Sequence, residues 1–192
     1  MGLAAVGGKI HAIGGVGGSR LESVEAYDPQ LGAWAPVASM SVQRYFHASV
    51  VLGGKIYAMG GQGDEGTLDT VEVYDPQADS WQQVASMPQR LEDHAAAVMG
   101  GKIYVTGGIN QGTVNPAYVY DPQADAWTQL ASMGIARRLH ASAAVDGKLY
   151  VFGGMGVGER LSTAEVYDPA SDSWALVPSL TSARRDVAAV AL

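Results

Sequence analysis

The chain has 192 residues, of which 16% are charged, and its net charge is −7 at neutral pH. A negative net charge argues against non-specific nucleic-acid binding, which requires a basic surface. The absence of cysteine excludes disulfides, thiolate catalysis and cysteine-based zinc sites, and leaves the redox compartment open. No apolar run is long enough to cross a membrane and residues 1–6 do not resemble a signal peptide, so we expect a soluble protein, with the cytoplasm slightly favoured.

One pattern recurs four times and fills the whole chain. A glycine pair, a Tyr-Asp-Pro tripeptide and a tryptophan return in the same order at a nearly constant interval. The glycines are Gly14, Gly15, Gly60, Gly61, Gly107, Gly108, Gly153 and Gly154, the tyrosines are Tyr27, Tyr74, Tyr120 and Tyr167, and the tryptophans are Trp34, Trp81, Trp127 and Trp174. Such regularity indicates a repeat fold, in which each unit needs its neighbours to bury its apolar face.

The second copy shows the expected order of strands. Residues 47–52 are small or β-branched and are followed by Gly53-Gly54, a two-residue hairpin signal. Residues 55–59 form the next strand, which ends in the glycine pair. After a variable loop, a third strand covers 70–74, an Asp-Pro turn follows, and a fourth strand covers 81–85. We call these strands A, B, C and D.

The other copies follow the same order, and no helical period is sustained, so we predict an all-β chain with almost no helix. Strand A is rich in alanine and serine, whereas strand D carries the tryptophan. Small side chains near a hub and bulky ones at a rim are typical of propeller blades. We therefore assign structural roles to the glycine pairs, which permit close backbone approach, and to the tyrosines and tryptophans, which would pack between blades.

The repeated motif Gly-Lys-Ile-(His/Tyr)-x-x-Gly-Gly, then Glu-x-Tyr-Asp-Pro, then Trp, resembles the kelch repeat in all four copies. The resemblance implies a β-propeller built of four-stranded antiparallel blades, with four blades in this chain, although kelch propellers usually have six or seven. Two positions depart from the pattern. His11 replaces the strand-B tyrosine of the first copy, and Tyr118 stands where the other copies have glutamate, at Glu25, Glu72 and Glu165.

We expect one kelch propeller domain over residues 1–192, with blades at about 1–40, 41–87, 88–133 and 134–180. Residues 181–192 match the beginning of strand A and would form an extra innermost strand that closes a ring or pairs with another chain. A closed four-blade ring, two chains sharing an eight-blade ring and an excerpt of a longer propeller are all open. Unpaired edges and apolar blade faces invite self-association, so we prefer a homodimer that completes a larger ring.

The expected binding surface is the face that carries the B–C and D–A loops. The B–C loops differ between copies, whereas the A–B and C–D turns are nearly constant, and this contrast favours a binding surface as much as simple loop drift. The D–A segments add charge and bulk near the axis. The candidate contact residues there are Tyr45, Phe46, Glu92, Asp93, Arg138, Leu139, Arg185 and Asp186.

Arginines also recur in the D–A segments. We interpret Arg44, Arg90, Arg137 and Arg184 as one equivalent position, at which pairing with a neighbouring carboxylate or carbonyl is favoured over ligand binding. The resemblance adds that kelch adaptors of ubiquitin ligases grip acidic peptides with arginines at this rim. Only Arg138 and Arg185 carry that idea here.

Histidines lie in register at the start of strand A, at His47, His94 and His140. A ring of imidazoles could bind a metal, but a packing role is favoured, and we predict neither a metal nor a cofactor.

Three functions are weighed. A non-catalytic scaffold that binds a protein or peptide is preferred, because the sequence shows no nucleophile motif and no phosphate-binding glycine loop before a helix. A carbohydrate-acting kelch enzyme, such as a sugar mutarotase, is the alternative, since it needs only well-placed acid–base groups. The second alternative is an excised or engineered propeller fragment whose main property is self-assembly.

Overall fold

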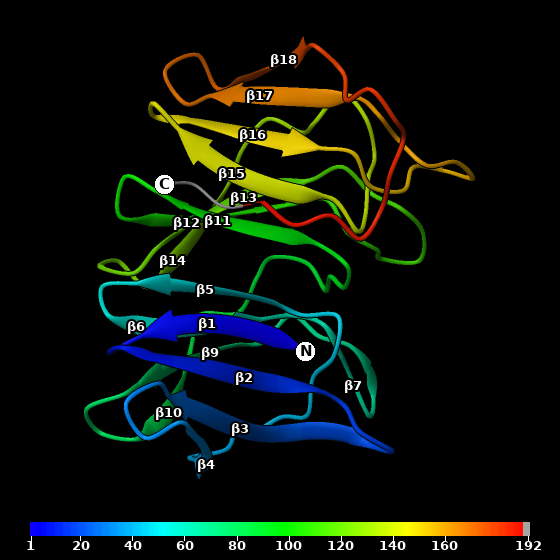
Figure 1. The fold of residues 1–192 in the computed structure, drawn as a ribbon. Helices are drawn as coiled ribbons and strands as arrows, with labels where there is room; N and C mark the ends of the chain where they lie inside the picture. The colour runs from blue at the N-terminus through cyan, green and yellow to red at the C-terminus, as the bar shows by residue number, and fades with distance from the viewer. Residues whose placement is uncertain (190–192) are drawn as a thin grey trace. The chain divides into compact units, whose positions relative to one another are not determined.

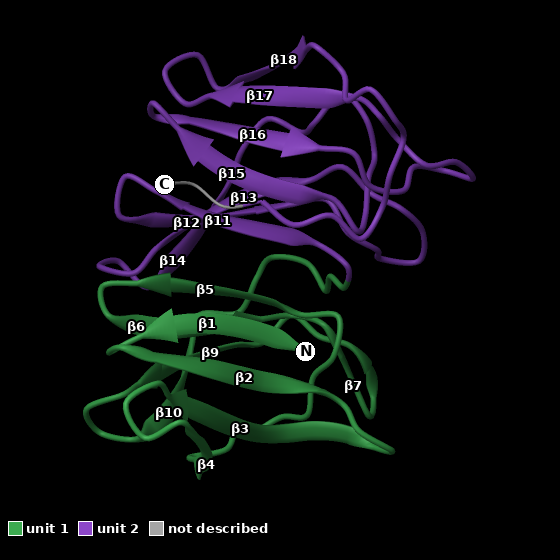
Figure 2. Cartoon of the chain, in the orientation of Figure 1, with its two compact units in different colours: residues 1–92 green, residues 93–192 purple. Residues whose placement is uncertain are grey.

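The computed structural model describes residues 1–189, which form strands, turns and loops without a helix. The chain divides into two compact units, residues 1–92 and residues 93–192 (Figure 2). Each unit contains two four-stranded antiparallel sheets.

Unit 1 begins with a sheet in which neighbouring strands follow chain order (Figure 1). Its strands are β1 (Gly2–Val6), β2 (Lys9–Val16), β3 (Arg20–Asp28) and β4 (Ala33–Val37). The second sheet contains β5 (Ala48–Leu52), β6 (Lys55–Met59), β9 (Val71–Asp75) and β10 (Ser80–Val84). A small hairpin between β6 and β9 consists of β7 (Gln62–Gly63) and β8 (Gly66–Thr67).

Unit 2 repeats this arrangement. Its first sheet contains β11 (Ala95–Met99), β12 (Lys102–Thr106), β13 (Ala117–Asp121) and β14 (Ala126–Gln129). Its second sheet contains β15 (Ala141–Val145), β16 (Lys148–Phe152), β17 (Ala164–Asp168) and β18 (Ser173–Val177).

The predicted fold class, all-β with four-stranded antiparallel propeller blades and four blades in the chain, is confirmed by these sheets. The strands of the second copy agree with the sequence-based bounds to within one residue at each end, whereas the hairpin β7–β8 was not predicted. Residues 181–189 form no strand, and residues 190–192 lie outside the described part of the chain. The extra innermost strand therefore stays a prediction.

The glycine pairs occupy a crowded turn at the end of each B strand. All eight paired glycines have positive φ, between 53° and 106°, where a side chain is strained. The amide of Gly61 donates to the carbonyl of Leu91 at 2.8 Å, and a Cβ on Gly61 would lie 2.6 Å from the carbonyl oxygen of Tyr45. The glycine pair of the second blade thus lies between the D–A segment before the blade, at Tyr45, and the D–A segment after it, at Leu91.

The core of each unit lies between its two sheets. In unit 1, Ile56 and Tyr74 of the second sheet pack with Ile13 and Val24 of the first. In unit 2, the cluster contains Leu149 and Tyr167 of the second sheet with alanine, methionine and tyrosine side chains of the first. The alanine-rich first strands contact each other within each unit, β1 with β5 and β11 with β15. Small side chains permit this close approach, as the composition of strand A predicts.

A hydrogen-bonded tryptophan joins the outer edges of the two sheets in each unit. In unit 1, Trp81 Nε1 donates to the carbonyl oxygen of Ala38 at 2.8 Å. Asp79 Oδ1 accepts from the amide of Ala38 at 2.9 Å and from the hydroxyl of Tyr74 at 2.7 Å. We call this arrangement the rim clamp.

Unit 2 repeats the rim clamp with the same atoms. Trp174 Nε1 donates to the carbonyl of Ala131 at 2.8 Å, and Asp172 Oδ1 accepts from Ala131 N and from Tyr167 OH. The backbone amide of Ala131 is the main cause that lowers the pKa of Asp172 below its ordinary value, and the Tyr167 hydroxyl acts in the same direction. The aspartate is therefore a charged acceptor within the clamp.

A buried arginine joins the inner part of the same sheets. Arg44, in the segment after β4, donates to Gly60 O at 2.9 Å and Thr70 O at 3.1 Å, and pairs with Glu72 Oε2 at 2.7 Å. We call this the arginine clamp. A buried pair of this kind is stable only when further hydrogen bonds satisfy both charges, and the two carbonyl oxygens help to meet this requirement for the guanidinium.

The second arginine clamp is in unit 2. Arg137 donates to Gly153 O at 2.8 Å and pairs with Glu165 Oε1 at 2.8 Å, and the side chain of Arg137 is fully buried. Glu165 also accepts from the amides of Gly134 and Ile135. The structural role predicted for the repeated arginine is thus confirmed for Arg44 and Arg137.

The assignment of Arg90 to this series was wrong. Leu91, not Arg90, makes the backbone hydrogen bonds of the series, to Gly61 and Leu68, and its side chain is buried. Arg90 is exposed and lies 3.9 Å from Asp69. The Gln-Arg dipeptide at 89–90 imitates the one at 43–44, but the spacing from the preceding tryptophan identifies Leu91 as the counterpart of Arg44.

Candidate binding surface

Two residues in every D–A segment follow the arginine position, and they include all the predicted contact residues. The first of the two is Tyr45, Glu92, Arg138 or Arg185, and the second is Phe46, Asp93, Leu139 or Asp186. Every residue at the second position has φ between 52° and 56°, in the left-handed region that non-glycine residues rarely adopt. The backbone is therefore the same in all four segments, while the side chains that it presents differ.

Backbone hydrogen bonds hold these positions in place. In unit 2, the amide of Leu139 donates to Asp93 O at 2.9 Å, and the amide of Asp186 donates to Leu139 O at 3.0 Å. Arg138 and Met155 exchange two backbone hydrogen bonds, at 2.9 and 2.7 Å, which tie the D–A segment to the following B–C loop. Contact residues fixed in this way need little ordering when a ligand binds.

The loop face of unit 1 is aromatic. The rings of Tyr45 and Phe46 have centroids 4.5 Å apart, and the guanidinium carbon of Arg20 lies 5.3 Å from the centroid of the Tyr45 ring. Arg20 also donates to Gly63 O in the β7–β8 hairpin at 2.7 Å, and the Tyr45 hydroxyl donates to Gln62 Oε1. Because Phe46 is half exposed, this surface offers an aromatic ring beside a held cation.

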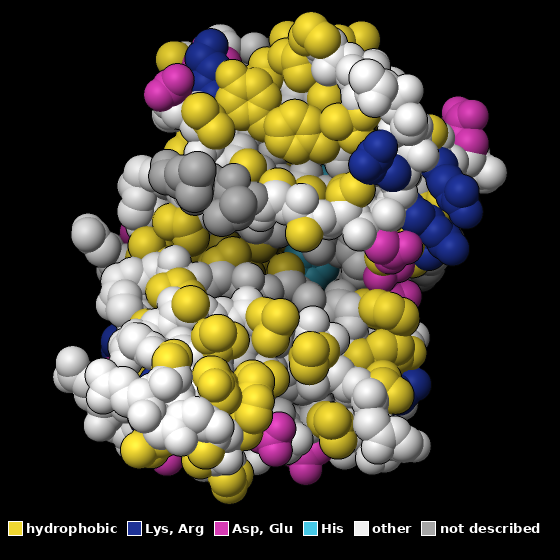
Figure 3. Space-filling view, viewed as in Figure 1, with side chains coloured by type: hydrophobic (Ala, Val, Ile, Leu, Met, Phe, Trp, Pro, Cys, Tyr) yellow, Lys and Arg dark blue, Asp and Glu magenta, His cyan; other side chains and the backbone are white. Residues whose placement is uncertain are grey.

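The loop face of unit 2 is charged. Arg138 pairs with Asp93 at 3.4 Å, and Arg185 lies 3.5 Å from Asp186. Basic and acidic side chains gather together over these loops in Figure 3. Burial raises the pKa of Asp93, and the positive charge of Arg138 acts against this shift.

The pair Asp93–Arg138 keeps unused hydrogen-bonding capacity. Asp93 Oδ1 and Arg138 Nε are both buried atoms, and neither has a hydrogen-bond partner among the described residues. A buried acceptor and a buried donor without partners are costly unless something satisfies them.

The histidines in register have a structural environment. His140 Nε2 and Thr106 Oγ1 share a hydrogen bond at 2.9 Å, and His140 is buried. Burial is the main cause that lowers the pKa of His140 to about 3, and Arg137 and His94 add to the shift through their charges. Within residues 1–189, no three histidine, aspartate or glutamate side chains are grouped so that they could hold a metal ion.

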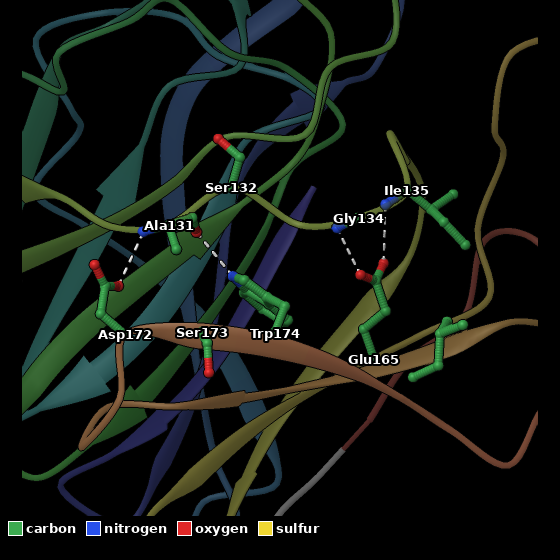
Figure 4. Close-up of a pocket in the computed structure, with 9 residues that line it drawn as sticks. Ala131, Ser132, Gly134, Ile135, Glu165, Asp172, Ser173 and Trp174 are labelled. Carbon is green, nitrogen blue, oxygen red and sulfur yellow. Dashed lines mark hydrogen bonds between the residues drawn. The ribbon is translucent and has the colours of Figure 1, made fainter.

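A groove of about 430 Å³ lies between the two sheets of unit 2, near their outer edge. Glu165, Asp172 and Trp174 line it, and Figure 4 shows that the hydrogen bonds of all three run to the segment 131–135. These bonds belong to the two clamps, so the polar groups of the groove already have partners within the blade pair. The groove therefore reflects how the sheets are joined, and it contains none of the predicted contact residues.

Sequence reasoning missed several loop residues beside the predicted contacts. In unit 1, Arg20 and Gln62 contact Tyr45, and Asp64 pairs with Arg20. In unit 2, Met155 exchanges backbone hydrogen bonds with Arg138. The glycines flanking Asp64-Glu65 signal the β7–β8 turn in the sequence. The other contacts join residues of different loops, which no local pattern could reveal.

Comparison with protein families agrees with the repeated blades. Residues 1–137 match the KLHDC2/KLHL20/DRC7 Kelch-repeats domain, and residues 136–181 match the Kelch motif. The chain belongs to the kelch-repeat family. Together the two matches cover all four blades.

Curated relatives of this kelch chain match it over part of its length. Kelch-like protein 33 of Homo sapiens is 38% identical over 65 residues, which are 33% of this chain and 12% of the relative. Kelch repeat and BTB domain-containing protein 13 of Mus musculus is 39% identical over 64 residues, 32% of this chain and 14% of the relative. The putative F-box/kelch-repeat protein At4g34170 of Arabidopsis thaliana is 44% identical over 61 residues, 31% and 21% of the two chains.

The match therefore covers no more than about a fifth of the length of these relatives. Across the described part of the kelch chain, no helix has the length and apolar character needed to cross a membrane.

Proposed function

We propose that this kelch chain is a non-catalytic scaffold that binds a protein or peptide on the face formed by the B–C loops and D–A segments. The observation that carries the proposal is the contrast between a constant backbone and variable side chains at the two positions after the arginine place. A rigid frame that presents different chemistry in each repeat is typical of binding surfaces on repeat proteins.

The chemistry of the two units favours a peptide-like ligand. The partly exposed guanidinium of Arg138 offers charged hydrogen-bond donors at the surface, which suit an acidic side chain. Phe46 offers an exposed aromatic ring, which suits an apolar anchor residue. Family membership adds support, because relatives named for kelch repeats combine them with BTB or F-box segments.

Peptide display on the purified chain tests this proposal. Selected peptides would be measured by fluorescence anisotropy against wild type, Arg138→Ala and Phe46→Ala. We expect at least one variant to weaken binding at least roughly tenfold, the effect of about 1.4 kcal/mol, because truncating a central contact residue commonly costs this much.

The matched control is Lys102→Ala. Lys102 is exposed and pairs with Asp121 at 2.9 Å, on the side of the blade opposite the loop face. Binding should be unchanged in this variant. A ligand that loses affinity with Lys102→Ala but not with the two loop-face variants would place binding elsewhere, and the proposal would then be wrong.

The mutarotase alternative gains no specific support from the geometry. An imidazole with a pKa of about 3, as in His140, is a weak base near neutral pH, and general catalysis works best when the pKa lies near the working pH. A sugar-anomerisation assay would reveal such an activity directly.

A further inference from the structure

The outward sheet face of the first blade is uncovered. We define it as the first-blade face, formed by Leu3, Ile10, Glu25, Tyr27 and Trp34. Ile10 is 42% exposed and Trp34 is 50% exposed. Apolar side chains lie at the surface over β1 to β3 in Figure 3.

The same face is buried in the other blades. The counterparts of Ile10 are Ile56, Ile103 and Leu149, and none of the three is exposed. Strand register identifies them, because Ile10, Ile56, Ile103 and Leu149 each pair with the tyrosine of the Tyr-Asp-Pro motif. The first-blade face thus has the composition of a blade junction but lacks a covering blade among the described residues.

Glu25 occupies the glutamate position of the arginine clamp. It pairs across the sheet with Ala12, as Glu72 pairs with Ala58. Glu72 is buried against Arg44, whereas Glu25 is exposed and has no ion pair among the described residues. The first-blade face therefore presents one half of an arginine clamp.

Arg184 presents the other half. Its carbonyl accepts from Gly154 N at 2.8 Å and its amide donates to Leu161 O at 3.1 Å, as the carbonyl and amide of Arg44 do with Gly15 and Leu21. Asp186, two residues later, has φ of 56°. The side chain of Arg184 is exposed, and within residues 1–189 it makes a long hydrogen bond, from Nε to Ser182 O at 3.4 Å. The backbone around Arg184 thus has the same conformation as the backbone around Arg44, whose side chain enters the following blade.

The rim-clamp positions of the two surfaces also match. One surface lacks the amide donor of the clamp, and the other lacks the aspartate that would accept from it. In each rim clamp an alanine amide donates to an aspartate, Ala38 to Asp79 and Ala131 to Asp172. After β18 the counterpart of the alanine is Pro178, which has no amide hydrogen, and on the first blade the counterpart of the aspartate is Gly32. Where these two met, no alanine-position amide would be left without its aspartate, although the Tyr27 hydroxyl would lack the acceptor that Tyr74 and Tyr167 have.

We propose that the first-blade face binds the segment 178–184 of a second copy of this chain, head to tail. Arg184 of one copy would pair with Glu25 of the other, and the indole of Trp34 would donate to the carbonyl of Pro178. Two such contacts, one at each end of the chain, would join two copies into a closed dimer.

Light scattering coupled to size-exclusion chromatography tests the proposal on the full chain. We expect twice the 20.0 kDa mass of one chain for wild type. Arg184→Leu and Glu25→Tyr should each raise the dissociation constant at least roughly 100-fold, because each leaves one charge of a buried pair without its partner. The double variant should regain association, because it removes both charges and leaves neither one buried without its partner.

Lys148→Leu is the control, since Lys148 is exposed, pairs with Asp168 inside its own blade and should leave the mass unchanged. Circular dichroism of each single variant checks that the blades remain folded. Wild type at the mass of one chain, or a dimer that neither single variant weakens, would overturn the proposal. A double variant no better than the singles would overturn the pairing of Arg184 with Glu25.

Discussion

At the scale of single residues, burial decides which charged side chains have structural roles. Arg44 and Arg137 are fully buried and find carbonyl and carboxylate partners, whereas Arg138 and Arg185 remain accessible on the loop face. His140 is a third case, because it is buried without a carboxylate partner. Its neutral form is therefore the one that the fold stabilises.

His140 should make the stability of the chain depend on pH. Its pKa is lowered to about 3 in the folded state, against 6.5 ordinarily, so the unfolded chain binds more protons between these values. His140 therefore costs the folded state nothing above pH 6.5, and the free energy of unfolding falls as the pH is lowered from 6.5 toward 3. At pH 5 the loss amounts to about 2 kcal/mol, from about 1.4 kcal/mol per unit of pKa difference.

Urea denaturation of wild type and His140→Gln at pH 7.5 and pH 5 would measure this effect. Glutamine can keep a hydrogen bond to Thr106 but does not titrate, and all other titrating groups are common to both proteins. Wild type should lose more stability than the variant on acidification. Equal losses in the two proteins would show that His140 is not the cause.

At the scale of elements, the D–A segment inside each unit joins the two sheets of that unit by a rim clamp and an arginine clamp. The arginine clamp is ionic in both units, with Arg44 and Glu72 in one and Arg137 and Glu165 in the other. A buried ion pair can be exchanged for apolar residues, but removal of one partner leaves an uncompensated charge. The two positions should therefore behave as one unit in mutagenesis.

The variants Arg137→Leu and Arg137→Leu/Glu165→Tyr test this coupling. The single change should cost about 3–5 kcal/mol, because Glu165 stays buried without its guanidinium. The double change should recover most of that loss, because it removes both buried charges together and replaces them with side chains that can pack. Chemical denaturation measures both values, with Lys148→Leu, an exposed lysine paired with Asp168, as a control of little effect. Additive losses in the double variant would contradict the coupling.

The repeat explains how much of each element could be predicted from the sequence. Strand A of the second copy was placed correctly because Gly53-Gly54 fixes the hairpin, and both glycines have positive φ. The position of the arginine was wrong in the second D–A segment, because the local dipeptide at 89–90 outweighed the spacing from Trp81. The loop contacts of Arg20 with Gly63 and Tyr45 depend on tertiary structure, so the sequence carried no signal for them.

At the scale of the whole molecule, the chain is a kelch-repeat protein whose blades are joined by a repeated set of hydrogen bonds. The most direct sign of these junctions is the tryptophan indole. Trp81 and Trp174 each donate to an alanine carbonyl at 2.8 Å, whereas Trp34 is half exposed and has no acceptor among the described residues. The indoles of Trp34, Trp81 and Trp174 therefore report on which of these junctions are formed.

Hydrogen exchange of the indole N–H groups, followed by nuclear magnetic resonance at several protein concentrations, tests the central claim that this bond forms wherever one blade follows another. Trp81 and Trp174 should exchange slowly at every concentration, and Trp34 should gain protection only as copies associate. Fast exchange at Trp81 and Trp174, or exchange at Trp34 that does not change with concentration, would contradict the account.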